Sequence, residues 1–376
     1  MLRQAGMLIG GIVIMAGCLP SFGVGVGGGL NITLPPLEQI ASPGAGDMLA
    51  FTRFDYTDFT SLDTALILLD DEHGVRDVYH TSGYLTPPVW SPDGTQLAFI
   101  TYRPDGQGKL HVMQADAGTI SEIGSGTFVD TPHWSPDGER IALFSSGLAP
   151  ASGGGQSNVR VYTLADGGVV ELPLAGAQDF VWLPGSDLLV LARNSSAWKA
   201  ATLQPDGTSI SEVPLTALSG AWYVVLSPDG TRVAFSLPAS DPDALTDPLY
   251  VANWDGSDVV HVGDLWFDGS VVWSPDGSQL AAITLTPDYR MALYVVSADG
   301  SDRRQLMLLD EGDESGEIYP GVPAWSPDGT RIAIGSTIDP MNGSAIFVLN
   351  ADGSGQQQIT NASGGIYDLS WRPPTP

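Results

Sequence analysis

The chain has 376 residues and a formal charge of −28, from 43 acidic and 15 basic residues. Charged residues make up 15 % of the chain and hydrophobic residues 43 %, so the composition can form a core and is not that of an acidic disordered chain. Because phosphate binding requires clustered Lys and Arg, this charge balance argues against nucleic acid and anionic lipid headgroups as partners.

The first residues have the pattern of an export signal. Arg3 precedes an apolar run from Ala5 to Ala16, which is shorter than the ~20 apolar residues of a membrane span. The single cysteine, Cys18, excludes an internal disulfide and follows small residues at the expected cleavage site. Met15-Ala16-Gly17-Cys18 resembles the bacterial lipobox, in which the cysteine is acylated and becomes the new N-terminus.

We therefore expect residues 1–17 to be a lipoprotein-type signal peptide and Cys18 to be a lipid anchor. The protein would then be held on the extracytoplasmic side of a membrane, periplasmic or at the cell surface. A plain secretory signal, or an uncleaved anchor with an incidental cysteine, is the alternative. Residues 18–41 are rich in Gly and Pro without sustained periodicity, which predicts a flexible tether. A Gly-rich segment of about this length spans roughly 25–30 Å.

Residues 42–376 repeat one unit. The sequence Trp-Ser-Pro-Asp-Gly, or a variant of it, recurs about every 47 residues, starting at Trp90, Trp134, Trp182, Leu226, Trp273, Trp325 and Trp371. Ser, Pro, Asp and Gly are preferred at successive positions of a type I turn, and Gly can adopt positive φ so that a second strand folds back. A third strand, a second Asp-Gly turn and a short fourth strand follow, as at Leu293–Val296 and Asp299-Gly300.

Four strands per repeat at this period predict the blades of a β-propeller. Met48–Phe51, Leu66–Leu69 and Val75–His80 supply three strands of a blade without a first strand, and Leu369–Trp371 supplies a first strand alone. Joining these halves predicts an all-β, seven-bladed β-propeller of four-stranded antiparallel blades, closed by strands from both termini. An open solenoid would leave exposed strand edges and would not explain the complementary half-blades. We expect a monomer.

The repeats are similar to those of TolB-type propellers, a WD-repeat-like family of bacterial periplasmic proteins. They also resemble the propeller of prolyl-oligopeptidase-type enzymes. The resemblance covers residues 42–376 and implies a role at the cell envelope. TolB carries an additional N-terminal α/β domain and the peptidases carry a hydrolase domain, and we expect neither in this sequence.

Candidate functional residues lie on the side of the propeller opposite the Ser-Pro-Asp-Gly turns, where connections vary in length. They are aromatic and acidic residues near the start of each first strand, together with one histidine that replaces a small or apolar residue. These candidate ligand-binding residues are Tyr84, Phe128, Asp130, His133, Asp179, Trp222, Phe267, Asp268, Tyr319 and Asp368.

Two interpretations of these residues remain open. An aromatic and carboxylate ring at the mouth of a central channel could stack a sugar or peptide and accept its hydrogen bonds or positive charge. Alternatively, the aromatic side chains are wedges that pack one blade on the next. His133 could line the channel as a ligand or base, or could be held by a neighbouring loop.

We expect no cofactor, no metal and no catalytic nucleophile. The histidines fall at different places in their blades, and none of the nucleophile-elbow, zinc, phosphate-loop or dinucleotide motifs occurs. The acidic stretch at residues 310–317 could bind calcium, but it lacks the spacing of an EF-hand and is more typical of a solvated loop.

The leading interpretation is a membrane-tethered extracytoplasmic binding or protein-interaction scaffold of the cell envelope, with an envelope protein, peptide or glycan as partner. The alternative is a carboxylate-dependent lyase or hydrolase acting on a glycan or peptide at the channel mouth. A third possibility is a sensor of glycan or peptide without chemistry. Convergence of Asp130, His133 and Asp179 on one channel wall would favour the enzyme.

Overall fold

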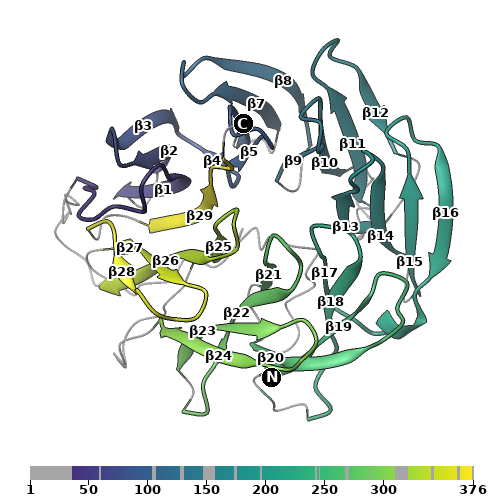
Figure 1. The fold of residues 1–376 in the computed structure, drawn as a ribbon. Coiled ribbons are helices and arrows are strands. Elements are labelled where there is room, and N and C mark those ends of the chain that lie inside the picture. Colours follow the sequence, from purple (N-terminus) through teal and green to yellow (C-terminus); the bar gives the residue numbers. More distant parts are fainter. Residues whose placement is uncertain are drawn as a thin grey trace, which may run out of the picture.

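The structure is a computed structural model. It describes residues 36–374, apart from 59–60, 104–106, 128–130, 147–156, 173–175, 195–196, 242–243, 245, 267–270, 289, 310–320, 340–342 and 362–364. Seven antiparallel sheets stand around one central axis (Figure 1). The predicted seven-bladed β-propeller is therefore confirmed. None of the helices in the described part of the chain has the length and hydrophobicity to span a membrane.

We number the blades 1–7 around the ring and give their strands from the centre outward. Blade 1 consists of β29 (Gly365–Trp371), β1 (Met48–Asp58), β2 (Ser61–Asp70) and β3 (Gly74–Thr81). Blade 2 consists of β4 (Tyr84–Leu85) and β5 (Val89–Trp90), then β6 (Gln96–Tyr102), β7 (Gly108–Gln114) and β8 (Ile120–Gly126). Blade 3 consists of β9 (His133–Trp134), β10 (Arg140–Ser146), β11 (Ser157–Thr163) and β12 (Val169–Glu171).

Blade 4 consists of β13 (Ala177–Trp182), β14 (Leu188–Asn194), β15 (Ala197–Leu203) and β16 (Ser209–Pro214). After the short 3-10 helix η1 (Thr216–Leu218), blade 5 consists of β17 (Tyr223–Leu226), β18 (Arg232–Ser236), β19 (Thr246–Asn253) and β20 (Val260–Trp266). Blade 6 consists of β21 (Val271–Trp273), β22 (Gln279–Leu285), β23 (Met291–Ser297) and β24 (Arg303–Leu308). Blade 7 consists of β25 (Ala324–Trp325), β26 (Arg331–Asp339), β27 (Gly343–Asn350) and β28 (Gln357–Gln358).

Blade 2 differs from the others because its inner strand is interrupted. Both β4 and β5 pair with β6, on either side of Thr86-Pro87-Pro88. Proline has no N–H to donate to the ladder. The side chain of Thr86 instead accepts a hydrogen bond from the Ile100 N–H (2.9 Å), so β6 remains satisfied at the break.

The two ends of the chain meet in blade 1, as the half-blades predicted. β29 pairs antiparallel with β1, with Trp371 opposite Leu49 and Gly365 opposite Phe54. Strands from both termini thus close the ring.

The repeated motif forms the expected tight turn. In the turn at Ser91–Gly94, the Gly94 N–H donates to the Ser91 carbonyl (2.8 Å), and Gly94 has a φ of +66°. The Ser91 hydroxyl donates to the Asp93 carboxylate (2.6 Å), and the Thr95 N–H donates to the same oxygen (3.0 Å). These bonds hold the pKa of Asp93 below its usual value.

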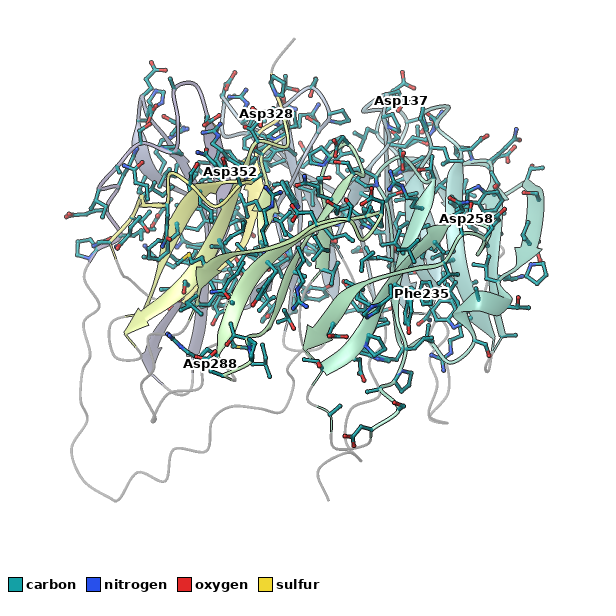
Figure 2. The ribbon with its side chains drawn as sticks, turned by 60° about the horizontal axis from the view of Figure 1, so that its bottom comes forward. Asp137, Phe235, Asp258, Asp288, Asp328 and Asp352 are labelled. Carbon is teal, nitrogen blue, oxygen red and sulfur yellow. The ribbon has the colours of Figure 1, made fainter. Side chains whose placement is uncertain are left out.

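The propeller has two different faces (Figure 2). Asp137 and Asp328, from two of the repeated turns, lie on the upper side of that view, and Asp288, between β22 and β23, lies on the lower side. We call these the turn face and the loop face. In blades 2–7 the inner strands run from the loop face to the turn face, because each of them ends at a repeated turn.

The core is divided among the joints between neighbouring blades. Each of seven buried apolar clusters combines side chains of two adjacent blades. In the joint between blades 1 and 2, for example, Ala50 and Leu66 pack with Trp90, Phe99 and neighbouring residues. The apolar burial that stabilises the fold is therefore the contact of sheet on sheet around the ring.

Tryptophan side chains of the motif connect neighbouring inner strands. At six of the seven joints the indole N–H donates to a backbone carbonyl of the preceding blade, at 3.0–3.2 Å. The pairs are Trp90 to Ser370, Trp134 to Val89, Trp182 to His133, Trp273 to Val225, Trp325 to Val272 and Trp371 to Ala324. We call these the indole joints. Since Trp371 donates to blade 7 and Ser370 accepts from blade 2, β29 is held on both sides.

Residues 36–41 belong to the segment expected to be a tether, and here they lie against blades 7 and 1. Leu37 is buried in the cluster between these blades. Gln39 forms a β-bridge with Thr360, and the Ile40 N–H donates to the Ile359 carbonyl (2.8 Å). The described part of the chain therefore begins at the outer edge of blade 7.

Candidate functional site

Five of the ten predicted site residues are described by the structure, namely Tyr84, His133, Asp179, Trp222 and Asp368. Cys18, Phe128, Asp130, Phe267, Asp268, Tyr319 and the acidic stretch 310–317 lie outside the described residues. The five lie on or directly before the inner strands of blades 1–5. They do not form one cluster. Tyr84 and Asp368 lie at the joint between blades 1 and 2, and the other three make their contacts elsewhere on the ring.

His133 packs against blade 4 at the indole joint made by Trp182. The imidazole lies against the Phe180 ring, with centroids 4.6 Å apart, and no described side chain donates to it or accepts from it. Burial lowers the pKa of His133 to about 4, because the charged imidazolium would lose hydration without gaining a partner. The side chain is therefore neutral at neutral pH.

Asp179 connects blade 4 to blade 5. One carboxylate oxygen accepts from the Phe180 N–H (2.8 Å), and the other accepts from the Leu226 N–H (2.6 Å). Leu226 stands at the motif position where the other six blades have Trp, so this joint has no indole donor. We call this contact the carboxylate joint. His133 and Asp179 both contact Phe180, His133 through the ring and Asp179 through the backbone N–H, but they do not bond to each other. The third member of the predicted convergence, Asp130, lies outside the described residues.

The following joint uses the same strand position differently. Tyr223 stands three residues before Leu226, as Asp179 stands three before Trp182. Its hydroxyl donates to the Val271 carbonyl of blade 6 (3.1 Å), and burial raises the pKa of the Tyr223 phenol. Trp222, directly before it, packs beside Tyr223 with ring centroids 6.0 Å apart.

Asp368 stands at this position in blade 1, three residues before Trp371. One carboxylate oxygen accepts from the Thr52 hydroxyl (3.0 Å). Among the described residues no other side chain or backbone group bonds to the carboxylate. Burial raises the pKa of Asp368 to about 6, and the Thr52 hydroxyl only partly offsets that rise.

The backbone at Asp368 is also unusual. Its φ is +61°, in the left-handed region that non-glycine residues seldom adopt. The register between β1 and β29 shifts at this point, between Ala50 and Thr52. The resulting β-bulge turns the Asp368 side chain toward Thr52.

Three aromatic rings contact one another on the face of β1 that also carries Thr52, the partner of this carboxylate. The Phe54 ring contacts the Tyr84 ring of blade 2 (centroids 5.4 Å apart) and the Tyr367 ring of β29 (5.3 Å). Thr52 and Phe54 are on the same face of β1, about 7 Å apart along the strand. We call Phe54, Tyr84, Tyr367 and Asp368 the acid–aromatic cluster. Tyr84 is 41 % exposed, so the cluster is open to solvent.

This cluster lies toward the loop face, because Gly365 and Phe54 pair at the end of β1 that is remote from the repeated turns. The sequence indicated Tyr84 and Asp368 but missed Phe54. Phe54 lies in a blade whose first strand comes from the other end of the chain, so its distance from a motif tryptophan is not visible in the sequence.

A metal site is not evident in the described ranges: they contain no group of three or more His, Cys, Asp or Glu side chains placed to hold an ion.

A second aromatic group lies between blades 4 and 5, where the Arg193 guanidinium lies 5.7 Å from the centre of the Trp198 ring and donates to the Ala221 carbonyl (3.3 Å).

Comparison with known proteins gives one family match. The family model of the TolB beta propeller domain matches residues 50–257, more than half of the chain. A search among curated proteins finds no significant match.

Solved structures share the fold at low sequence identity. TolB from Acinetobacter baumannii is 15 % identical, with a TM-score of 0.54 over 88 % of this chain and 68 % of that one. An oligogalacturonate lyase from Vibrio parahaemolyticus is 13 % identical, with a TM-score of 0.53 over 84 % and 86 % of the two chains. A prolyl endopeptidase is 16 % identical, with a TM-score of 0.58 over 86 % of this chain and 50 % of that one.

Proposed function

We propose that this chain, which belongs to the TolB beta propeller domain family, is a membrane-tethered extracytoplasmic scaffold of the cell envelope. In this proposal its loop face binds a protein or peptide partner. The observation that carries the proposal is the acid–aromatic cluster, which combines a half-exposed ring with a carboxylate oxygen that bonds to no described residue, on a rigid ring of strands. Aromatic rings next to a few polar groups are typical of binding sites.

The membrane tether is supported by the lipobox-like segment ending at Cys18 and by the position of residues 36–41 on the ring. Residues 36–41 lie along the outer edge of blade 7, so the preceding segment would join the ring at its rim, away from the acid–aromatic cluster. A flexible chain from residue 18 to residue 35 would span roughly 20–25 Å. An anchor at the rim leaves the loop face accessible.

The anchor is tested by replacing Cys18 with Ala and separating membrane from soluble extracytoplasmic fractions. We expect Cys18→Ala to move the protein to the soluble fraction and Ser21→Ala, three residues further on, to leave it on the membrane. Membrane retention of the Cys18→Ala variant would contradict the lipid anchor.

The binding face is tested by photo-crosslinking in intact envelopes. A photoreactive phenylalanine derivative is placed at Tyr84 on the loop face or, as a matched control, at Glu139 in an exposed turn of the turn face. We expect a discrete crosslinked species from position 84 and none from position 139. Equal products from both faces, or none from position 84, would contradict the proposed scaffold.

The second candidate is a carboxylate-dependent lyase or hydrolase acting on a glycan or peptide. A specific observation favours it: a carboxyl group with a pKa of about 6 can exchange protons near neutral pH. Since an oligogalacturonate lyase shares the fold, oligogalacturonate is a suitable first substrate. Formation of an unsaturated product, detected by its ultraviolet absorbance and abolished by Asp368→Asn, would establish the enzyme.

A further inference from the structure

We infer that the acid–aromatic cluster is a subsite for one cationic side chain, the ammonium of Lys or the guanidinium of Arg, in the partner peptide. Asp368 is its counter-ion, and Phe54, Tyr84 and Tyr367 form its aromatic wall. The inference rests on the proposed binding role of the loop face, and it adds the chemistry of the partner.

Asp368 and Asp179 occupy the same strand position but have different partners. Asp179 uses both carboxylate oxygens on backbone amides, and one of these belongs to the next blade. Asp368 uses one oxygen, on the Thr52 hydroxyl, and bonds to no described residue of blade 2. The joint beyond Asp368 is already closed, because the Trp90 indole donates to the Ser370 carbonyl (3.2 Å). Asp368 is therefore not needed to connect blades.

The backbone of Asp368 is held in an unusual conformation by its strand. A non-glycine residue with a φ of +61° is held there against a conformational cost, and such residues concentrate at functional sites. Here the surrounding strand pairs determine the conformation, since β29 pairs with β1 on both sides of the bulge. The carboxylate is thus held in a fixed position, and no Lys or Arg in the described ranges forms an ion pair with it.

The basic residue next to Thr52 in the chain does not pair with Asp368. Arg53 is adjacent to Thr52 in β1, so its side chain points to the opposite face of the strand. Its guanidinium lies 3.8 Å from the Asp77 carboxylate of β3. The face that carries Thr52 and Phe54 is the one toward blade 2, where Ala50 of the same strand packs against Trp90 and Leu97.

A carboxylate beside aromatic rings favours a cationic ligand group. A carboxylate attracts a cation, and the faces of aromatic rings add a cation–π attraction that a neutral or anionic group does not gain. An anionic partner group would be repelled both by Asp368 and by the net charge of −28. The half-exposed Tyr84 ring leaves an approach from solvent.

The test uses a library of 12-residue peptides displayed on phage and selected on the purified full-length protein. The tightest binder is resynthesised with each Lys replaced by norleucine and each Arg by citrulline, which keep the shape and remove the charge. We expect one such replacement to weaken binding at least about 10-fold.

The site is located with variants. Asp368→Asn is expected to bind the charged and uncharged peptides within about twofold of each other, and Tyr84→Ala to lose most of the preference while Tyr84→Phe keeps it. Asp179→Asn is the matched control at the other joint and should keep the full preference. Thermal unfolding of each variant confirms that it is folded.

The outcomes separate this inference from the proposed function. Peptides that bind equally well without their positive charge overturn the cationic subsite and leave the peptide-binding scaffold in place. A charge preference that survives in Asp368→Asn overturns the assigned location. The absence of any selected peptide overturns both the subsite and the scaffold.

Discussion

The joint between blades 1 and 2 and the joint between blades 4 and 5 carry an aspartate at the same strand position but use it differently. Where Trp90 supplies an indole N–H, the joint closes through that bond, and one oxygen of Asp368 bonds to no residue that the structure describes. Where Leu226 replaces the tryptophan, Asp179 accepts the backbone N–H of Leu226 instead. The role of the acid in one blade is therefore set by the motif residue of the next blade.

The largest effect is expected from making the first joint resemble the second. Trp90→Leu removes the indole bond to Ser370, much of the buried ring volume and the contact with the Arg372 guanidinium, which lies 5.4 Å from the ring centre. We expect the free energy of unfolding to fall by about 2–4 kcal/mol, measured by chemical denaturation. A loss no larger than that of an exposed substitution would show that the indole joints do not stabilise the ring.

His133 provides a titratable reference outside both joints. Its folded pKa of about 4 lies below the unfolded value near 6.5, so the unfolded chain binds more protons in this range. The stability from the neutral imidazole is complete above pH 6.5 and is lost as the pH falls through 4. His133→Gln should remove up to about 3 kcal/mol of this pH dependence, measured by denaturation at pH 4 and pH 7. An unchanged pH profile would contradict the neutral, buried imidazole.

The contribution of Asp368 to stability should change with pH in the opposite direction to that of His133. Its folded pKa of about 6 lies above the ordinary value of 3.8, so the folded protein binds more protons between these values. The stability that this group contributes is complete below pH 3.8 and is lost as the pH rises through 6. Asp368→Asn should therefore gain stability over the natural protein as the pH is raised from 4 to 8, by up to about 3 kcal/mol.

The two contributions to stability nearly cancel in the natural protein between pH 4 and pH 6, because that of His133 rises with pH and that of Asp368 falls. Replacing either residue should therefore reveal the pH dependence due to the other. A double variant, His133→Gln with Asp368→Asn, is the control and should lack both contributions. If Asp368→Asn changes stability equally at pH 4 and pH 8, the carboxyl is not held in an unfavourable environment.

A smaller effect is expected at the carboxylate joint. Asp179→Ala leaves the Leu226 N–H without its acceptor, and we expect a loss of about 1–3 kcal/mol in the free energy of unfolding. At neutral pH the matched substitution Asp368→Ala should lower the free energy of unfolding by less than Asp179→Ala does, or should raise it, because Asp368 connects no blades. Equal losses from both substitutions would remove the distinction between the two joints.

The fold could be predicted because its signals are local. The Ser-Pro-Asp-Gly turns form their hydrogen bonds within five residues, and the unpaired half-blades at the two ends had to meet. The candidate site could be predicted only in part. The sequence pointed to Tyr84 and Asp368 by their place before the motif, but the link from Asp179 to Leu226 depends on which blades are neighbours. The pKa shifts of His133 and Asp368 depend on burial, which the sequence does not contain.

The proposed binding site cannot form before the last strand, β29, is in place. Asp368 and Thr52 are 316 positions apart in the sequence, and they meet only when the last strand is placed beside β1. A chain still being synthesised lacks Tyr367 and Asp368, and its β1 edge is unpaired. The proposed binding site therefore forms in the same late, long-range step as ring closure. A chain truncated before residue 365 should lose the closing strand and the proposed binding site together.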